Sequence, residues 1–134
     1  MVVSSVWQEA NDRFADAIRL KACGRFADAA DGLATLAADA TAPNRFHATL
    51  ELANCLVLEG RTEDASSRFA DARALDPGSH WPVTGLVDMM VARGDVSGAF
   101  ALITASYDGL RPDGRAMLAR RRAEIAAHLH TAQT

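Results

Sequence analysis

Apolar residues recur at helical spacing along most of the chain, and the clearest stretch surrounds Gly60. Spacings of three and four place apolar side chains on one face of a helix. Proline cannot continue a helix, so Pro77 marks the end of the second stretch. The pattern therefore predicts two helices joined by a turn at Gly60. The apolar stripes before and after the turn are Leu52, Ala53 and Leu56, then Ala65, Phe69 and Ala72.

The same arrangement occurs three times along the chain. Gly24, Gly60 and Gly94 are separated by 36 and 34 residues, and an alanine follows each glycine by five positions. A period near 34 is typical of repeats that each contain two helices and a turn. Glycine adopts a positive φ without strain, which ends a helix. We therefore expect these three glycines to lie at the turns.

These residues resemble the tetratricopeptide repeat, a family of helix pairs with a glycine turn and a closing proline. The resemblance covers about residues 10–112. In the first copy Asp16 stands where a large apolar residue belongs, and the closing prolines of the outer copies are displaced to Pro43 and Pro112. The middle copy matches at Leu52, Ala53, Leu56, Gly60, Ala65, Phe69, Ala72 and Pro77. The outer copies match in part, at Ala17, Leu20, Gly24, Ala29, Leu33 and Leu36, and at Leu86, Val87, Met90, Gly94, Ala99 and Ile103.

The resemblance implies an all-α fold, a right-handed α-α superhelical solenoid of three helix pairs with a C-terminal capping helix. A single domain over 1–134 is expected, with repeats at about 6–43, 44–79 and 80–111 and the capping helix at 112–130. Ser5 and Gln8 have the spacing of a capping box, which predicts a first helix from Val6 to Ala22. Together these elements make seven helices.

In such a stack the first helix of each pair lines a concave inner face. This face is predicted to be an apolar strip with a few polar groups, which suits an amphipathic helix or an apolar peptide. Phe14, Leu50 and Trp81 are the expected anchors, although some of these side chains could instead pack into neighbouring helices. The predicted groove residues are Asn11, Phe14, Ile18, Lys21, His47, Leu50, Asn54, Val57, Trp81, Thr84 and Asp88.

Protein–protein interaction as an adaptor or scaffold is the function this reading favours. A small chaperone for a secreted or aggregation-prone substrate is an alternative that the resemblance also implies. A homodimeric self-assembly module is another, because Trp7 on the first helix and the apolar face of the last helix are expected to be exposed. Capture of acidic chaperone tails is disfavoured, because the matching positions supply no cation and Glu51 would repel a carboxylate.

Composition narrows the partners further. The 134 residues include 28 alanines, with 14 Lys and Arg against 17 Asp and Glu, for a net charge of −3. Near-balanced charge disfavours a nucleic-acid binder or an anionic-membrane binder. No apolar run of membrane-spanning length occurs, and the start lacks a basic signal-peptide region, so we expect a cytoplasmic chain without membrane insertion. The alanine and arginine bias favours a bacterial origin.

The sequence contains no motif that indicates catalysis, metal binding or cofactor binding. No nucleophile elbow, phosphate loop or zinc-binding His-Glu-x-x-His segment is present. His128 and His130 are two residues apart and point to different faces of a helix, and we expect this pair to lie in a frayed tail. Cys23 and Cys55 lie inside helical patterns and are expected to be reduced core residues.

Two groups of charged residues have structural interpretations. Asp28, Asp64 and Asp95 recur beside the turns, where a carboxylate stabilises a helix N-terminus. Arg120, Arg121 and Arg122 span much of a helix circumference, so at least one of them should lie near the packed side with its stem over apolar surface.

Overall fold

The computed structural model describes residues 2–133, with side-chain surroundings for residues 5–131. Met1 and Thr134, the ends of the expected 1–134 domain, lie outside the described residues. Within the described range the chain contains seven α-helices, a short 3₁₀ helix and no strand, which confirms the all-α prediction and the expected number of helices. The helices are α1 (Val2–Ala22), α2 (Phe26–Ala38), α3 (Arg45–Leu58), α4 (Thr62–Leu75), α5 (Trp81–Ala92), α6 (Val96–Ser106), η1 (Tyr107–Gly109) and α7 (Pro112–Gln133).

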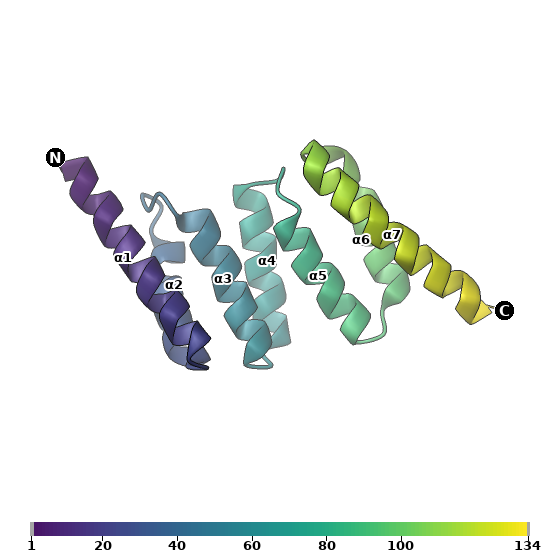
Figure 1. Ribbon diagram of the computed structural model, residues 1–134, viewed down its shortest axis with the longest axis horizontal. Helices are drawn as coiled ribbons and strands as arrows, with labels where there is room; N and C mark the ends of the chain where they lie inside the picture. The colour runs from purple at the N-terminus through teal and green to yellow at the C-terminus, as the bar shows by residue number, and fades with distance from the viewer. Residues whose placement is uncertain (1, 134) are drawn as a thin grey trace. The chain divides into compact units, whose positions relative to one another are not determined.

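The chain forms two compact units, and within each unit every helix packs against its neighbours in the sequence. Unit 1 ends at Leu75 and contains α1 to α4, whereas unit 2 begins at Asp76 and contains α5 to α7. In unit 1, α1 packs on α2, α2 on α3 and α3 on α4, and in unit 2, α5 packs on α6 and α6 on α7. Within each unit, successive helices run back and forth (Figure 1).

The three turns share one backbone geometry. Gly24, Gly60 and Gly94 have φ values of +81°, +79° and +87°, which confirms that they occupy the left-handed conformation. The residue after each glycine donates its backbone N–H to the carbonyl five positions earlier, for example Arg61 to Leu56 at 2.9 Å. This bond satisfies a carbonyl that the helix end would otherwise leave unpaired. The glycine repeat in the sequence is therefore a repeat of helix-ending turns.

The turn aspartates stabilise the start of the second helix in each pair, as predicted. Asp28 and Asp64 lie in the first turns of α2 and α4, and each forms an ion pair with the arginine three residues before it. Asp95 caps α6 through its Oδ1 atom, which accepts the backbone N–H of Gly98 at 3.0 Å. These carboxylates are therefore engaged in helix capping and local pairing.

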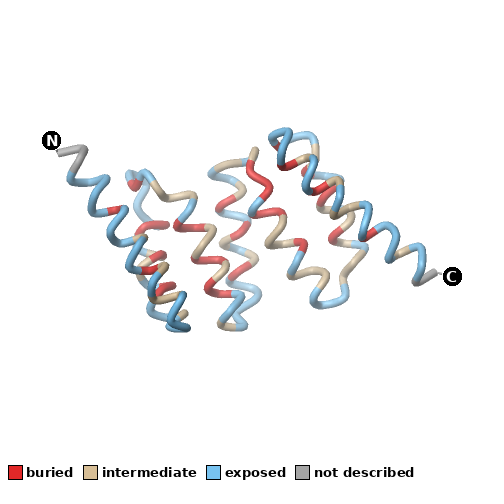
Figure 2. The backbone as a smooth tube through the Cα atoms, in the orientation of Figure 1, coloured by how far each residue is buried: buried red, intermediate tan, exposed pale blue. Residues whose placement is uncertain are grey.

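The predicted apolar stripes form the core of unit 1 but only part of the core of unit 2, where Leu86 and Met90 are half-buried. Figure 2 shows buried positions recurring along the helices. In unit 1 all six residues of the two stripes around Gly60 are buried, together with Leu33 and Leu36 of α2. Alanine supplies many of these positions, so the paired helices can approach closely. The core of unit 2 consists of Val83, Val87, Ala99, Ile103, Leu110, Leu118 and Ile125.

Helix α1 begins four residues earlier than predicted, at Val2. Ser5 therefore lies inside the helix and cannot be its cap, and the Gln8 side chain donates to Asp12 one turn later. The prediction that Cys23 is a core residue is also wrong. Cys23 follows the last residue of α1 and is exposed in the turn, whereas Cys55 is buried in α3 as predicted.

Helix α7 continues beyond the predicted end at His130 to Gln133. The expectation that His128 and His130 lie in a frayed tail is therefore wrong, because both residues are helical. The arginine cluster on this helix follows the prediction. Arg121 and Arg122 are half-buried while Arg120 is exposed, and the Arg122 guanidinium lies 4.9 Å from the centre of the Tyr107 ring.

Candidate functional site

Two long-range polar contacts join α1 to α3 in unit 1. The Asn44 side chain, just before α3, donates through Nδ2 to the Ala10 carbonyl at 3.0 Å. Further along, Lys21 Nζ lies 2.7 Å from Glu51 Oε2. The two helices therefore run side by side in the same direction. We call the surface formed by Asn11, Phe14, Ile18 and Lys21 of α1 with His47, Leu50, Glu51, Asn54 and Val57 of α3 the α1–α3 face.

The apolar side chains of the α1–α3 face are partly covered. Phe14, Ile18 and Leu50 are half-buried, so they contribute to packing and still present apolar surface to solvent. Asn11 and His47 are exposed near one end of the face, and Val57 is 37% exposed near the other. These side chains lie on one surface because their spacing of three and four repeats on each helix. The result is an apolar strip with polar side chains at one end.

A polar cluster interrupts this strip. The Lys21 and Glu51 side chains are 29% and 23% exposed, so their ion pair is shielded from water on most sides. Asn54 Nδ2 also lies 3.5 Å from Glu51 Oε1. Shielding strengthens the attraction of such a pair, and each charge neutralises the other. Lys21 is therefore not a free cation, and Glu51 is not a free carboxylate that would repel an acidic partner.

Cys55 directly follows Asn54 of this cluster in the chain. Cys55 is fully buried in α3, and burial raises the pKa of its thiol even though the Lys21 charge acts in the opposite direction. Because its pKa is raised, Cys55 remains protonated near neutral pH. Only a thiolate is strongly nucleophilic, so we interpret this cysteine as a core residue. No group of three His, Cys, Asp or Glu side chains in the described part of the chain is arranged to hold a metal ion.

The three predicted groove residues of unit 2 all lie on α5. Trp81 is 55% exposed, and its ring centre lies 4.3 Å from that of His80. Thr84 Oγ1 lies 3.2 Å from His80 Nδ1, and Asp88 pairs with Arg121 of α7 at 3.4 Å. Only Trp81 of the three therefore presents a large apolar surface to solvent.

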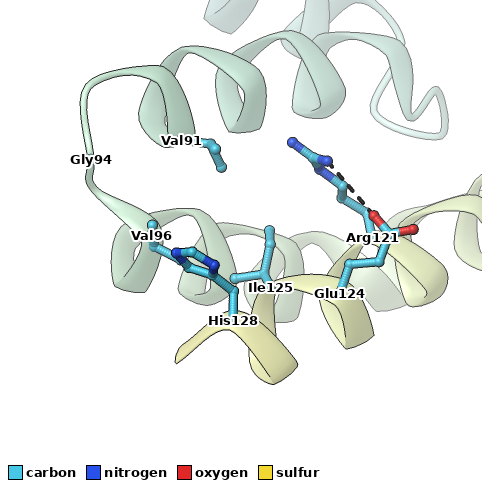
Figure 3. Close-up of a pocket in the computed structure, with 7 residues that line it drawn as sticks. All are labelled: Val91, Gly94, Val96, Arg121, Glu124, Ile125 and His128. Carbon is cyan, nitrogen blue, oxygen red and sulfur yellow. Dashed lines mark ion pairs between the residues drawn. The ribbon is translucent and has the colours of Figure 1, made fainter. Parts of the chain in front are cut away.

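Unit 2 also contains a pocket that the groove prediction did not include. It has a volume of about 350 Å³ and lies where α5, the turn at Gly94 and α6 face α7. Val91 and Ile125 point into it from α5 and α7 (Figure 3). Arg121 and Glu124, 3.7 Å apart, lie on one side of it, and His128 lies beside Val96 on the other. The sequence signal for this pocket is the apolar residues on both sides of the third turn, Val91 and Val96, together with Ile125 of α7.

Comparison of the chain with protein-family models, with curated proteins and with solved structures finds no match. Among the described residues, none of the helices combines the length and the apolar content needed to cross a membrane.

Proposed function

We propose that the chain is a protein-interaction module of the tetratricopeptide-repeat type, which holds a partner helix or short peptide on the α1–α3 face. The observation that carries this proposal is the half-exposed apolar strip of Phe14, Ile18 and Leu50 around the neutralised Lys21–Glu51 pair. Apolar surface next to a few fixed polar groups is the usual composition of a peptide-binding surface.

The repeat geometry supports the family part of the proposal. Three helix pairs have the same positive-φ glycine and the same backbone bond across the turn, at a period near 34 residues. Each pair leaves an apolar face that the next element must cover. In the proposed right-handed solenoid α7 acts as the capping helix, since its Leu118 and Ile125 side chains are buried in the unit 2 core.

Binding would proceed by burial of apolar surface on helices that are already formed. A partner's apolar side chains would cover Phe14, Ile18 and Leu50, and the cost of ordering the receptor would be small because both helices are held by the fold. Asn11, His47 and Asn54 offer hydrogen-bond groups at the edges of the strip, which would fix the direction of the bound segment. Trp81 in unit 2 remains a predicted anchor.

The test is selection of binding peptides from a displayed library, followed by affinity measurements on the full chain. We expect Leu50→Glu to weaken a selected peptide at least about ten-fold, because a charge would be buried against the peptide's apolar side chains. Val57→Glu is a second variant on the same side of α3, and its side chain is already 37% exposed, so folding should tolerate it.

Met117→Glu is the matched control, because Met117 is a similarly large apolar residue that is 48% exposed on α7 of unit 2. Its affinity should stay within about two-fold of the wild-type value. Circular dichroism must show that each variant keeps its helices. If folded Leu50→Glu and Val57→Glu bind as well as the wild type, the α1–α3 face is not the binding surface.

A further inference from the structure

Helix α1 has a second pattern that extends beyond the part lying against α3. Because the helix runs unbroken from Val2 to Ala22, Trp7, Asn11, Phe14, Ile18 and Lys21 all lie on one face. Their spacings of four, three, four and three are those of the contact positions in a coiled coil. Trp7 is 53% exposed, which is unusual for so large an apolar side chain. We call these five residues the α1 seam.

The surroundings of the α1 seam suit contact with another helix. Ala15 and Ala22 lie along its exposed edge, and their small side chains allow a second backbone to come close. The acidic residues Glu9, Asp12 and Asp16 lie on other faces of α1 at helical spacing. Lys21, the only charged member, is neutralised by Glu51. Two copies of the seam can therefore meet without repulsion between like charges.

The start of the seam is also accessible. The hydrogen bond from Asn44 to the Ala10 carbonyl places the beginning of α3 beside Ala10. Trp7 lies about one helical turn before that level, so α3 does not flank it. A second helix can approach Trp7 without displacing any element of unit 1.

We infer that a second copy of this chain pairs with the first along the α1 seam, with the two α1 helices parallel and in register. Trp7 then packs on its own counterpart, as do Phe14 and Ile18. Asn11 meets Asn11 of the other copy, so the two amides can hydrogen-bond to each other. In the antiparallel arrangement that buries Trp7, each Asn11 faces a phenylalanine and its amide stays unpaired, which costs free energy. A single asparagine at such a position is a known device for fixing register.

The pairing does not depend on the proposed function, but it affects the same surface. A second α1 covers Phe14 and Ile18, so the dimer and a bound partner peptide compete for the α1–α3 face. The seam is only about 20 Å long, so it offers little surface for burial, and we expect the dimer to be weak and reversible.

Sedimentation equilibrium of the full chain, from micromolar to submillimolar concentration, tests the dimer. We expect a reversible monomer–dimer equilibrium that Trp7→Glu weakens at least about ten-fold, because a carboxylate would enter the seam. Trp81→Glu is the matched control, since Trp81 is 55% exposed on a different helix, and it should leave the dissociation constant within about two-fold. A wild-type chain that stays monomeric throughout, or equal weakening by both variants, overturns the inference.

Disulfide trapping tests the register. In a Cys23→Ser background, Asn11→Cys should form a linked dimer with oxidised glutathione, because facing residues of a parallel pair lie within the Cα separation of about 4–7 Å that a disulfide needs. Asp16→Cys lies on the opposite face of α1 and should stay monomeric. Failure of Asn11→Cys to link, or equal linking of both cysteines, excludes the parallel arrangement.

Discussion

At the scale of single residues, His80 illustrates how burial controls the charge of a side chain in this protein. It is 8% exposed, its Nδ1 atom lies 3.2 Å from Thr84 Oγ1, and its ring packs beside Trp81. A side chain added at Gly114 would lie 3.0 Å from His80 Cβ, so α7 comes close to His80. Burial lowers the pKa of His80 from its ordinary value of 6.5, although the Asp113 carboxylate acts in the opposite direction.

This lowered pKa predicts a loss of stability in mild acid. The unfolded chain binds a proton at His80 more readily than the folded chain does. The two states therefore differ in proton binding only in acid, and the contribution of His80 to the free energy of unfolding should be constant above pH 6.5. It should fall as the pH drops below 6.5, and level off below the folded pKa, with a slope of at most about 1.4 kcal/mol per pH unit. Urea unfolding of the wild type and of His80→Gln at several pH values measures this.

The control for that experiment is His47→Gln, because His47 is exposed on α3. It should keep the pH dependence of the wild type, whereas His80→Gln should lose most of the decrease between pH 6.5 and 5.5. An unchanged slope in His80→Gln would mean that carboxylates, rather than this imidazole, control stability in that range.

At the scale of helices and turns, the repeated unit is a pair of helices closed by a glycine at positive φ. A side chain added at Gly24, Gly60 or Gly94 would meet no atom within 4 Å, so space is not the reason for glycine at these positions. The backbone conformation is the reason, since any residue with a Cβ is strained there.

Gly60→Ala should therefore destabilise the chain by about 1 kcal/mol through backbone strain alone. Gly109→Ala is the matched control, because Gly109 also has open space around it but does not have a positive φ. Alanine at 109 should be neutral or slightly stabilising, since it restricts the unfolded chain. Thermal unfolding of both variants gives the comparison, and an equal loss at both positions would contradict the conformational explanation.

The turns and helix pairs could be predicted from the sequence because their signals are local. The turn at Gly60, the stripe of Ala65, Phe69 and Ala72, and the end of α4 before Pro77 each depend on residues within a few positions of one another. The start of α1 could not be located in this way. The spacing of Ser5 and Gln8 fits a cap, but the preceding residues are equally able to continue a helix, and they do.

The candidate surface was only partly predictable, because it depends on contacts between residues that are far apart in the sequence. Lys21 and Glu51 are 30 residues apart, and their ion pair exists only because the fold places α1 beside α3. No periodicity connects two such positions. The exposure of Cys23 was missed because helical spacing assigns a face to a residue and does not show that the helix ends one position before it.

At the scale of the whole molecule, each unit has its own buried residues. The unit 2 core joins residues of α5, α6 and α7 with Leu110, which follows η1. Arg111 reinforces this unit, because its guanidinium binds both carboxylate oxygens of Asp76 at 3.0 and 2.7 Å and its backbone N–H donates to the Gly78 carbonyl. These contacts hold the segment before α5, which contains Asp76 and Gly78, against the start of α7. In repeat proteins, units with their own cores unfold separately when the coupling between them is weak.

Ile103→Ala tests whether the two units unfold separately. Ile103 is completely buried in the unit 2 core, so removing most of its side chain should cost about 2–5 kcal/mol. We expect amide hydrogen exchange to accelerate in residues 76–133, while residues 2–75 keep the protection of the wild type. Leu33→Ala, at an equally buried position in α2, should produce the reverse pattern. Faster exchange throughout the chain in either variant would show that the units unfold in a single transition, because weakening one core would then lower the stability of both.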